Sequence, residues 1–505
     1  MKRLITSLGI LLLVSIMVQA QREALAPPVL RDFYTKVIAD YRVPGMAVAI
    51  VDNDSVLFSE GFGVLEKGSD RQVTNQTVFG IASLTKSFTS ALIANLVAED
   101  KLDFDMPLAK LYPQLQLYDS YVTSQITLRD ALAHRSGLAG FSGDLIWYGS
   151  KTPDSTIIHR LRYLEPKQGF RSGFGYSNIL YLLAGKVVEN ITETTFAQAL
   201  QQQFFEPLEM ERSFVDYTRL ATLENVAKPH IVANDSVVPF EYLSWDNMLP
   251  AGGVFSTTND MGRYLQMFLN NGRADDRKLI DSALLQEMWH AQIPLKPSWL
   301  DRHLSAPVNF KAYGLGWSMM DYAGIKVLNH SGGLDGMVSH MLVIPEQNIA
   351  AVFLTNKSTP LPTILMYDLL DRLTQNNRDW PGEALAFMNE HGSNEEPSDE
   401  VEPEEFDVQG NAFFAGHYYD SLVGKAEVYT QNNELCMKWN ESTLFSGVLS
   451  QSDCLTFDLE FPRVPSLPVG KLKFHLNAMG EVKGFSIDLP NPDLHFYELY
   501  FVKQN

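Results

Sequence analysis

A serine and a lysine stand three positions apart in the stretch GIASLTKSFTS, at Ser83 and Lys86. An apolar run over 88–97 follows, so a helix is expected over 83–100. Side chains three positions apart on a helix are neighbours, so the Lys86 amine can reach the Ser83 hydroxyl. A serine becomes a nucleophile when a base takes its proton, and burial favours the neutral amine that acts as such a base. The pair therefore indicates acyl-transfer chemistry, although the same spacing occurs by chance on many helices.

A second pair, Tyr176 and Asn178, directly precedes an apolar helical pattern in the stretch GFGYSNILYLLAGKVVE. A tyrosine beside a lysine can act as a general base and later return the proton to a leaving group. An asparagine amide can orient a substrate carbonyl or a lysine amine. A tyrosine packed at a helix start, followed by a helix cap, explains the same pattern when the pair is taken alone.

A third group, His330, Ser331, Gly332 and Gly333, lies in the stretch VLNHSGGLDGMVSHMLVIP. Glycines in a strand allow a ligand to approach the backbone closely. The backbone N–H of Gly333, together with that of Ser83, is expected to form an oxyanion hole. The residues before Gly333 are expected to bind polar groups of a substrate at the rim of the site. A glycine turn beside a bystander histidine is the alternative.

Three further polar residues are weaker candidates. His134, in the stretch AHRSGL, is expected to cap or pack a loop rather than to act as a base. His340 is expected to be structural, and Asp335 fits either a turn or a substrate contact. The two cysteines, Cys436 and Cys454, lie neither in a CxxC motif nor near clustered His, so the sequence does not support a metal site.

Strand patterns occur early and late in the chain, with helical patterns between them. A hairpin is expected over 45–65, helices over most of 105–285, strands again within 312–356, and a helix over 360–375. The two sets of strands are expected to join in one antiparallel sheet with helices packed on it. The segment 391–407 is acidic and rich in Pro, which is typical of an extended linker.

The remaining segment, 408–505, shows short alternating runs separated by turn signals, which predict a small β-barrel or sandwich. It also holds the two cysteines of the chain, Cys436 and Cys454. An oxidising compartment permits a disulfide between them, and two free thiols fit the sequence equally well.

Composition limits the partners and the compartment. Asp and Glu outnumber Lys and Arg by 60 to 40, and the resulting net charge of −20 repels phosphate backbones, so nucleic acid is not an expected partner. Residues 1–20 combine a basic start, an apolar stretch and Ala20, which is typical of a cleaved signal peptide. A membrane anchor is the alternative, and the shortness of the apolar stretch argues against it. The mature chain is expected in a bacterial periplasm or outside the cell, with no stable membrane span.

The three motifs, in this order and at these separations, resemble those of the serine β-lactamase and penicillin-binding-protein superfamily. The branch with class C β-lactamases, D-alanyl-D-alanine carboxypeptidases, D-aminopeptidases and related esterases is the most similar. The SxxK motif of that superfamily falls on Ser83 and Lys86, and its YxN motif falls on Tyr176 and Asn178. The third motif, usually Lys-Thr-Gly, looks like the HxG variant that begins at His330.

The resemblance covers roughly 28–380 and includes the flanking stretches LAHRSGL, PAGGVFSTTNDM and YGLGW. It implies an α+β fold over 21–390, with a β-lactamase/transpeptidase-like antiparallel sheet flanked by helices and an all-helical subdomain. The segment 408–505 resembles the lipocalin-like domain that often follows such proteins, so a small C-terminal β-barrel is expected.

The resemblance also implies a mechanism. Ser83 attacks a carbonyl, Lys86 and Tyr176 handle the proton, the amides of Ser83 and Gly333 hold the oxyanion, and water releases the acyl group. No metal or cofactor is implied, and the partner is a small ester, amide or peptide, with cell-wall peptides as one candidate. His330 replaces a permanent cation with a largely neutral ring, so esters or peptides of D-amino acids are expected rather than strong β-lactamase activity.

Three hypotheses follow from these residues. The leading one is an exported serine hydrolase of the esterase, D-amino-acid peptidase or weak β-lactamase type. The alternative is a catalytically idle protein that binds cell-wall peptides or a protein partner. In the third, the C-terminal β domain delivers the function by capping the cleft or holding a ligand.

Overall fold

The structure is a computed structural model that describes residues 25–233, 235–376, 378–391 and 410–504. The expected signal peptide over 1–20 and nearly all of the expected linker over 391–407 lie outside the described residues. None of the helices within the described ranges has the length and apolar character that a bilayer span requires.

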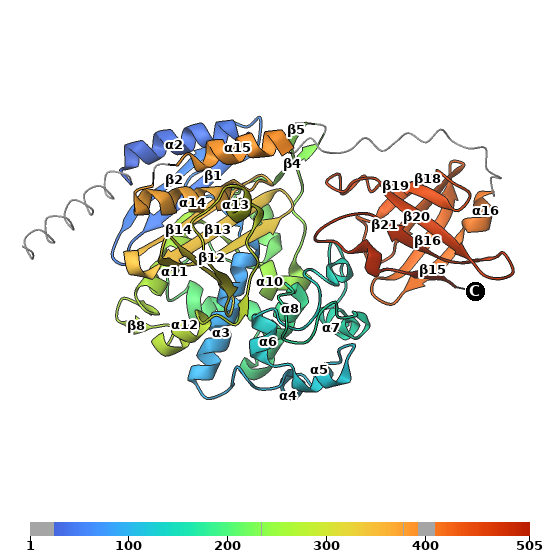
Figure 1. Cartoon of the computed structure of the whole chain (residues 1–505), viewed down its shortest axis with the longest axis horizontal. Helices are drawn as coiled ribbons and strands as arrows, with labels where there is room; N and C mark the ends of the chain where they lie inside the picture. The colour runs from blue at the N-terminus through green and yellow to red at the C-terminus, as the bar shows by residue number, and fades with distance from the viewer. Residues whose placement is uncertain (1–24, 234, 377, 392–409, 505) are drawn as a thin grey trace, which may run out of the picture.

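One antiparallel sheet joins the early and the late strands, as the sequence predicts (Figure 1). Its eight strands lie in the order β2-β1-β14-β13-β12-β11-β10-β9. The N-terminal hairpin pairs with the last strand of the set, and Ala49 lies opposite Val352. The strands are β1 (Gly45–Val51), β2 (Val56–Gly63), β9 (Ile293–Pro294), β10 (Lys311–Tyr313), β11 (Ser318–Tyr322), β12 (Ile325–Leu334), β13 (Met337–Ile344) and β14 (Ile349–Thr355).

The central strands are buried on both faces because helices cover both sides of the sheet. Every residue of β1 is buried, and alternate side chains enter different cores. One core contains Val48 and the helices α2 (Pro27–Asp40), α14 (Leu361–Thr374) and α15 (Trp380–His391). The other core contains Ala49 and the helical part of the molecule.

The helical part surrounds α3 (Thr85–Ala98), whose buried residues include polar and apolar side chains alike. Residues on all sides of this helix are buried, so α3 is a central core helix rather than a surface one. The neighbouring helices are α4 (Leu108–Leu111), α5 (Ser120–Gln125), α6 (Leu128–Leu132), α7 (Asp154–Arg160), α8 (Asn178–Thr192), α9 (Phe196–Leu200), α10 (Leu249–Gly252), α11 (Thr258–Leu269) and α12 (Ser282–Met288). The short helix α13 (Trp299–His303) belongs to the other core, where Trp299 stacks on Phe387 of α15.

The C-terminal segment forms a closed antiparallel barrel, which confirms the expected all-β unit (Figure 1). Aromatic side chains such as Phe474, Phe485 and Phe501 are fully buried and pack against one another in its interior. Cys436 and Cys454 are both free thiols, the first buried and the second exposed. The barrel strands are β15 (Gly416–Asp420), β16 (Gly424–Gln431), β17 (Glu434–Trp439), β18 (Ser446–Gln451), β19 (Thr456–Leu459), β20 (Gly470–Leu476), β21 (Val482–Asp488) and β22 (Phe501–Lys503).

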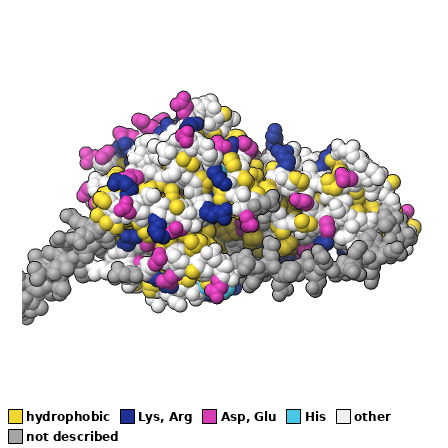
Figure 2. Space-filling model, turned by 90° about the horizontal axis from the view of Figure 1, so that it is seen from above, with side chains coloured by type: hydrophobic (Ala, Val, Ile, Leu, Met, Phe, Trp, Pro, Cys, Tyr) yellow, Lys and Arg dark blue, Asp and Glu magenta, His cyan; other side chains and the backbone are white. Residues whose placement is uncertain are grey.

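The barrel is attached to the helical part by polar contacts. The Arg160 guanidinium donates to both carboxylate oxygens of Glu441, over 2.8 and 3.1 Å. A second carboxylate, that of Glu498, accepts from the Ser142 hydroxyl at 2.5 Å and from the Gly143 backbone N–H at 2.9 Å. Figure 2 shows basic and acidic side chains interspersed among hydrophobic ones over one face of the molecule.

Replacing Glu441 with alanine is expected to lower the free energy of unfolding by about 1–3 kcal/mol, because the buried Arg160 guanidinium then loses its charged acceptor. Urea titration followed by circular dichroism measures this change. The control is Glu427→Ala, which removes a solvent-exposed ion pair with Lys438 between two strands of the barrel. It is expected to change the free energy of unfolding by less than about 0.5 kcal/mol. Equal losses in both variants would contradict a stabilising role for the Arg160 contact.

Candidate active site

Ser83 lies in a short 3-10 turn, η1 (Ala82–Leu84), and α3 begins two residues later. The expected helix over 83–100 is therefore divided into this turn and α3. Ala82 has a φ of 49°, in the left-handed region that non-glycine residues rarely adopt. This sharp backbone bend places Ser83 at the amino end of α3, where backbone N–H groups lack helical partners and favour negative charge.

The Lys86 amine contacts the Ser83 hydroxyl, with 3.0 Å between Nζ and Oγ. Side chains three positions apart are eclipsed in a 3-10 turn, which explains the direct contact across the start of α3. The contact has the length of a hydrogen bond, so the proton of Ser83 can pass to Lys86 without an intervening group.

The Lys86 amine is fully buried and has two other partners, both obligate acceptors. Nζ lies 2.8 Å from Oδ1 of Asn178 and 2.7 Å from the backbone oxygen of Ala251. Burial lowers the pKa of Lys86 well below its ordinary value, while the charge of Asp144 opposes this shift. In the neutral form the two acceptors take both N–H bonds, and the remaining lone pair faces the Ser83 hydroxyl.

Asp144 fixes the orientation of Asn178 and was not among the residues predicted from the sequence. Its Oδ2 accepts a 2.6 Å hydrogen bond from Nδ2 of Asn178, and its Oδ1 accepts one from Trp147. Burial raises the pKa of Asp144 to about 7, against the opposing effect of these hydrogen bonds. No sequence spacing marks Asp144 as functional, because its contact with Asn178 joins a short 3-10 turn to the start of α8, 34 positions later in the chain.

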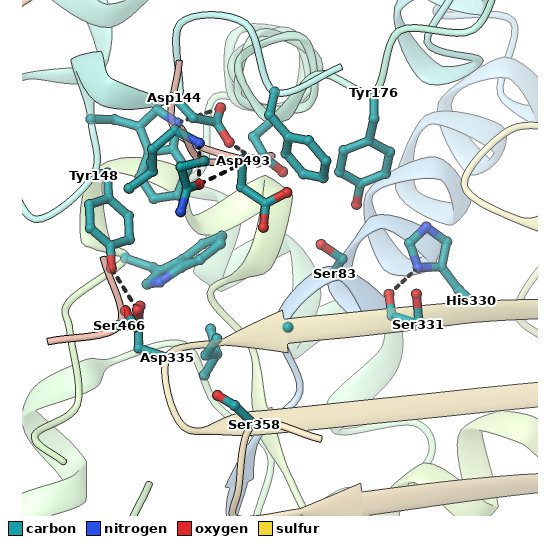
Figure 3. A pocket seen from close by; sticks show the side chains of 18 of the residues that line it. Ser83, Asp144, Tyr148, Tyr176, His330, Ser331, Asp335, Ser358, Ser466 and Asp493 are labelled. Atoms are coloured by element: carbon teal, nitrogen blue, oxygen red, sulfur yellow. Dashed lines mark hydrogen bonds between the residues drawn. The ribbon is translucent and has the colours of Figure 1, made fainter. Parts of the chain in front are cut away.

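Tyr176 lies above Lys86, and the amine is 4.7 Å from the centre of its ring. The tyrosine hydroxyl is directed toward Ser83 (Figure 3). Burial raises the pKa of Tyr176, while hydrogen bonding to Ser83 opposes that rise, so the side chain is a neutral phenol at pH 7. In this state Tyr176 can donate a proton.

Two loops form the backbone support of Tyr176. The amide of Phe141 donates to the carbonyl of Tyr176 at 2.6 Å, and the amide of Gly175 donates to the carbonyl of His134 at 2.8 Å. The buried His134 ring accepts a 3.0 Å hydrogen bond from the backbone N–H of Ser177. His134 thus packs a loop, in the manner that the sequence predicts, and its ring lies 4.3 Å from that of Tyr176.

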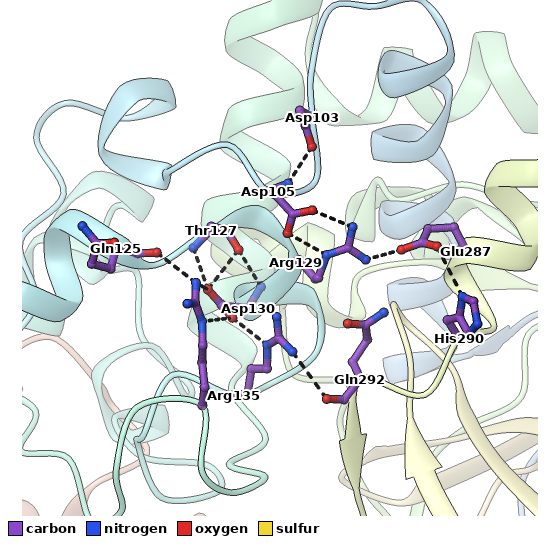
Figure 4. A network of polar contacts seen from close by, with 11 residues as sticks. Asp103, Asp105, Gln125, Thr127, Arg129, Asp130, Arg135, Glu287, His290 and Gln292 are labelled. Atoms are coloured by element: carbon purple, nitrogen blue, oxygen red, sulfur yellow. Dashed lines mark hydrogen bonds and ion pairs between the residues drawn. The ribbon is translucent and has the colours of Figure 1, made fainter.

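A buried carboxylate, Asp130, anchors the same two loops (Figure 4). Arg135 donates to it at 2.6 Å, and Arg171 donates twice, at 2.9 and 2.7 Å. Because the two arginines belong to different loops, the shared carboxylate fixes their separation. The pKa of Asp130 is lowered, since hydrogen bonds from Arg171 and Thr127 and the charge of Arg135 outweigh the effect of burial.

His330 lies on β12 and is buried, with both ring nitrogens occupied. Nε2 lies 2.8 Å from the Tyr313 hydroxyl, and Nδ1 lies 2.6 Å from the Ser331 backbone oxygen. Burial lowers the pKa of His330 to about 3, so the ring is neutral at pH 7. To bind a substrate, the His330 ring would have to exchange one of these partners, whereas Ser331 on the same strand is exposed.

The two glycines after Ser331 differ in their surroundings. A Cβ atom on Gly332 would lie 2.4 Å from the Ile81 oxygen and 3.0 Å from the Ser83 nitrogen. A Cβ atom on Gly333 would meet nothing within 4 Å. Gly332 therefore allows β12 to lie directly against the turn that carries Ser83.

A cavity of about 570 Å³ opens above Ser83, and loops of the barrel form part of its wall. The cavity brings together Ser83, Tyr176, Asn178, His330 and Ser331 with Gly333. Lys86 is buried against Ser83. Asp335, which accepts a 2.6 Å hydrogen bond from the Tyr148 hydroxyl, lies on the other side of Ser83 from His330 (Figure 3). The barrel contributes a wall of Val464, Ser466, Leu467, Asn491, Asp493 and Leu494.

Alanine at position 332 is expected to destabilise the fold by about 1–3 kcal/mol, because the added methyl group overlaps the fixed Ile81 carbonyl. Thermal unfolding measures this effect. The matched control is Gly333→Ala, whose methyl group meets open space and which is expected to change stability by less than about 1 kcal/mol. An unfolding temperature unchanged in Gly332→Ala would show that β12 does not press against the Ser83 turn.

Among the described residues, no group of three or more His, Cys, Asp or Glu side chains is placed to hold a metal ion. The reactive groups at the floor of the cavity are a serine, a buried amine and a phenol. This set can transfer protons and form an acyl-serine, given a carbonyl compound in the cavity.

A family model and several known proteins resemble this chain. The family model Beta-lactamase matches residues 30–375. Penicillin-binding protein 4 of Amycolatopsis lactamdurans is 28% identical over 360 residues, which cover 66% of this chain and 87% of the relative. Unguisins hydrolase ungD of Aspergillus violaceofuscus (strain CBS 115571) is 25% identical over 361 residues, 66% of this chain, and the match spans only 62% of that relative.

Solved structures share the fold. The octameric penicillin-binding protein homologue from Pyrococcus abyssi has a TM-score of 0.61 at 21% identity, and the match covers 94% of this chain and 99% of that one. A D-stereospecific amidohydrolase from Streptomyces has a TM-score of 0.53 at 22% identity, and the match covers 68% of this chain and 97% of that one. Since the family model matches most of its length, the chain belongs to the Beta-lactamase family.

Proposed function

We propose that the protein is an exported serine hydrolase that forms an acyl-enzyme on Ser83 and cleaves a small ester or amide. The observation that carries the proposal is the contact between the Lys86 amine and the Ser83 hydroxyl, 3.0 Å apart, with Lys86 fully buried. A penicillin-binding protein, a hydrolase and an amidohydrolase among the similar proteins support the same general chemistry.

The acylation step begins when the Lys86 amine takes the Ser83 proton and Oγ bonds to the substrate carbonyl carbon. The carbonyl oxygen then carries a negative charge, which the backbone N–H groups of Ser83 and Gly333 stabilise at the amino end of α3. Asn178 and Ala251 hold the amine in place, so the lone pair stays directed at Oγ.

The leaving group receives its proton from the Tyr176 phenol as the tetrahedral intermediate collapses. Lys86, which carries the former serine proton 4.7 Å from the ring centre, then restores the phenol. Water attacks the acyl-enzyme by the same sequence in reverse, and the acid leaves Ser83 free. Bacterial periplasm or the extracellular space is the proposed compartment.

The neutral His330 favours esters and D-amino-acid peptides over strong β-lactamase activity, because it supplies no permanent charge. The alternative is a catalytically idle protein that binds cell-wall peptides or a partner. Binding alone does not require a buried amine held against a serine hydroxyl, so the Ser83–Lys86 contact favours the hydrolase.

Rapid mixing with p-nitrophenyl acetate tests the proposal. A burst of p-nitrophenol equal to the enzyme concentration is expected from the native chain, because acylation of Ser83 by this activated ester is expected to be faster than hydrolysis of the acyl-enzyme. Ser83→Ala is expected to show no burst while keeping its unfolding temperature. The idle binder would be favoured if p-nitrophenol were released slowly and at equal rates by both proteins, and if amide substrates also gave equal rates in both.

The pH dependence of kcat/KM tests the role of Lys86. A base must be unprotonated to act, so kcat/KM is expected to rise through the lowered pKa of Lys86 and to level off well below the ordinary lysine value of about 10.4. Lys86→Arg places a guanidinium that stays protonated where the neutral amine stood, and it is expected to lower kcat/KM by about 10²–10⁴-fold. A native profile that continues to rise up to pH 10 would contradict a neutral amine as the resting base.

A further inference from the structure

One segment, residues 141–152, lies between the barrel and the reactive amine, and we call it the bridging segment. The carboxylate of Asp144, within this segment, accepts a hydrogen bond from Asn178, which in turn accepts one from Lys86. Barrel residues contact the bridging segment both before and after Asp144 in the sequence. The barrel is therefore connected to the reactive amine through residues in direct contact.

The attachment after Asp144 is made at the end of the bridging segment. The Ser442 hydroxyl donates to the Gly149 backbone oxygen at 2.9 Å, and the Glu441 carboxylate accepts from the Thr152 hydroxyl at 3.1 Å. Both contacts lie five or more positions beyond Asp144. They hold the end of the bridging segment without contacting the neighbours of Asp144.

The attachment before Asp144 is made by one carboxylate, that of Glu498 in the 3-10 turn η8 (Phe496–Glu498). One oxygen accepts from the Ser142 hydroxyl at 2.5 Å, and the other accepts from the Gly143 backbone N–H at 2.9 Å. Ser142 is buried and the Glu498 side chain is only 10% exposed, so solvent is nearly excluded from these contacts. The two donors directly precede Asp144, so a movement at Glu498 would reach Asp144 across one peptide unit.

The backbone just before Asp144 has a conformation that needs support. Phe141 has a φ of 63° and Gly143 a φ of 80°, both in the left-handed region, which is costly for phenylalanine. The Phe141 amide donates to the Tyr176 carbonyl, and the next two residues donate to Glu498. Loss of the Glu498 oxygens would leave a buried hydroxyl and a backbone N–H without acceptors, which favours a shift of this bend toward new partners.

A second residue of the barrel places this part of the barrel close to Asp144. Nδ1 of the buried His495 lies 3.6 Å from a carboxylate oxygen of Glu498. Hydrogen bonding to Glu498 and the charges of Glu498 and Asp144 raise the pKa of His495, against the effect of burial. The Glu498 carboxylate is thus enclosed between the barrel and the bridging segment.

We propose that Glu498 is a positioning residue: its carboxylate holds the bridging segment so that Asp144 keeps the Asn178 side chain directed at the reactive amine. The inference rests on the proposed hydrolase function. Glu498 is not among the described residues that line the active-site cavity, so it acts through these contacts and not on a substrate. A displacement of about 1 Å at a reacting group can lower a rate by about 10²-fold, and Oδ1 of Asn178 lies only 2.8 Å from Nζ of Lys86.

Rapid mixing with p-nitrophenyl acetate over a range of ester concentrations gives the acylation rate constant and the dissociation constant of the ester separately. Glu498→Met keeps the length of the side chain but has no oxygen acceptor. It is expected to lower the acylation rate constant about tenfold or more and to change the dissociation constant less than about threefold. Glu498→Gln keeps an oxygen for the Gly143 N–H, and its amide can donate to the Ser142 hydroxyl, so it is expected to stay within about threefold of the native rate constant.

The matched control is Glu441→Ala, which removes another barrel carboxylate from the far end of the bridging segment. It is expected to lower stability but to keep the acylation rate constant within about threefold of the native value. Ser142→Ala removes one donor to Glu498 at the cost of a single hydroxyl, and it tests the same contact should Glu498→Met fail to fold. It is expected to lower the acylation rate constant about threefold or more.

A native acylation rate constant in both Glu498→Met and Ser142→Ala would overturn the proposal. An equal loss in Glu441→Ala would also overturn it, because barrel docking in general would then be the cause. A Glu498→Gln variant as slow as Glu498→Met would do the same, since an acceptor oxygen would not suffice. Absence of a burst in the native chain refutes the hydrolase itself, whereas a native burst that the variants leave unchanged refutes only the role of Glu498.

Discussion

The burial of one amine determines much of the arrangement around it. A lysine ammonium in a core without solvent is unfavourable, and Lys86 is fully buried beside Ser83. The protein provides two fixed acceptors for its N–H groups and keeps the nearby Asp144 carboxylate one residue removed, behind Asn178. The starts of α3 and α8, the Ala251 carbonyl and the loop of Asp144 must therefore meet at one point. A small displacement of any of these elements would remove an acceptor from the buried amine and leave one of its N–H groups without a partner.

The sequence predicts the reactive residues better than their supports. Ser83 and Lys86 are predicted correctly because residues three positions apart are in contact within one helical turn. The barrel is predicted because the alternation of its strands is visible in short stretches of sequence. The roles of Asp144, in the 3-10 turn η2 (Asp144–Ile146), and of Ala251, in α10, are missed because they contact the site from segments far away in the sequence. The neutral phenol of Tyr176 and the occupied ring of His330 were not predictable either, since burial and partners set their protonation. The single sheet was predictable because the early and the late strand patterns flank one helical segment, and an acidic linker separates them from the strands of the barrel.

The barrel is part of the pocket as well as a separate β unit. Its interior is filled by aromatic side chains such as Phe474 and Phe485, and loops outside its strands, including those with Ser466 and Asp493, reach the cavity above Ser83. Specificity in such folds resides in loops, and here the loops come from two structural units. Contacts such as Arg160–Glu441 therefore influence the shape of the pocket as well as stability.

The order of residues along the chain imposes an order on assembly. All reactive groups, from Ser83 to Gly333, precede the barrel in synthesis, but the cavity wall is completed by residues as late as Leu494. A nascent chain can thus bring its serine, lysine and tyrosine together while the pocket is still open on one side. The wall that the barrel contributes is in place only when the last strands of the barrel have been made and have docked. Truncations near the carboxyl terminus would therefore leave the serine, the lysine and the tyrosine beside an unfinished wall.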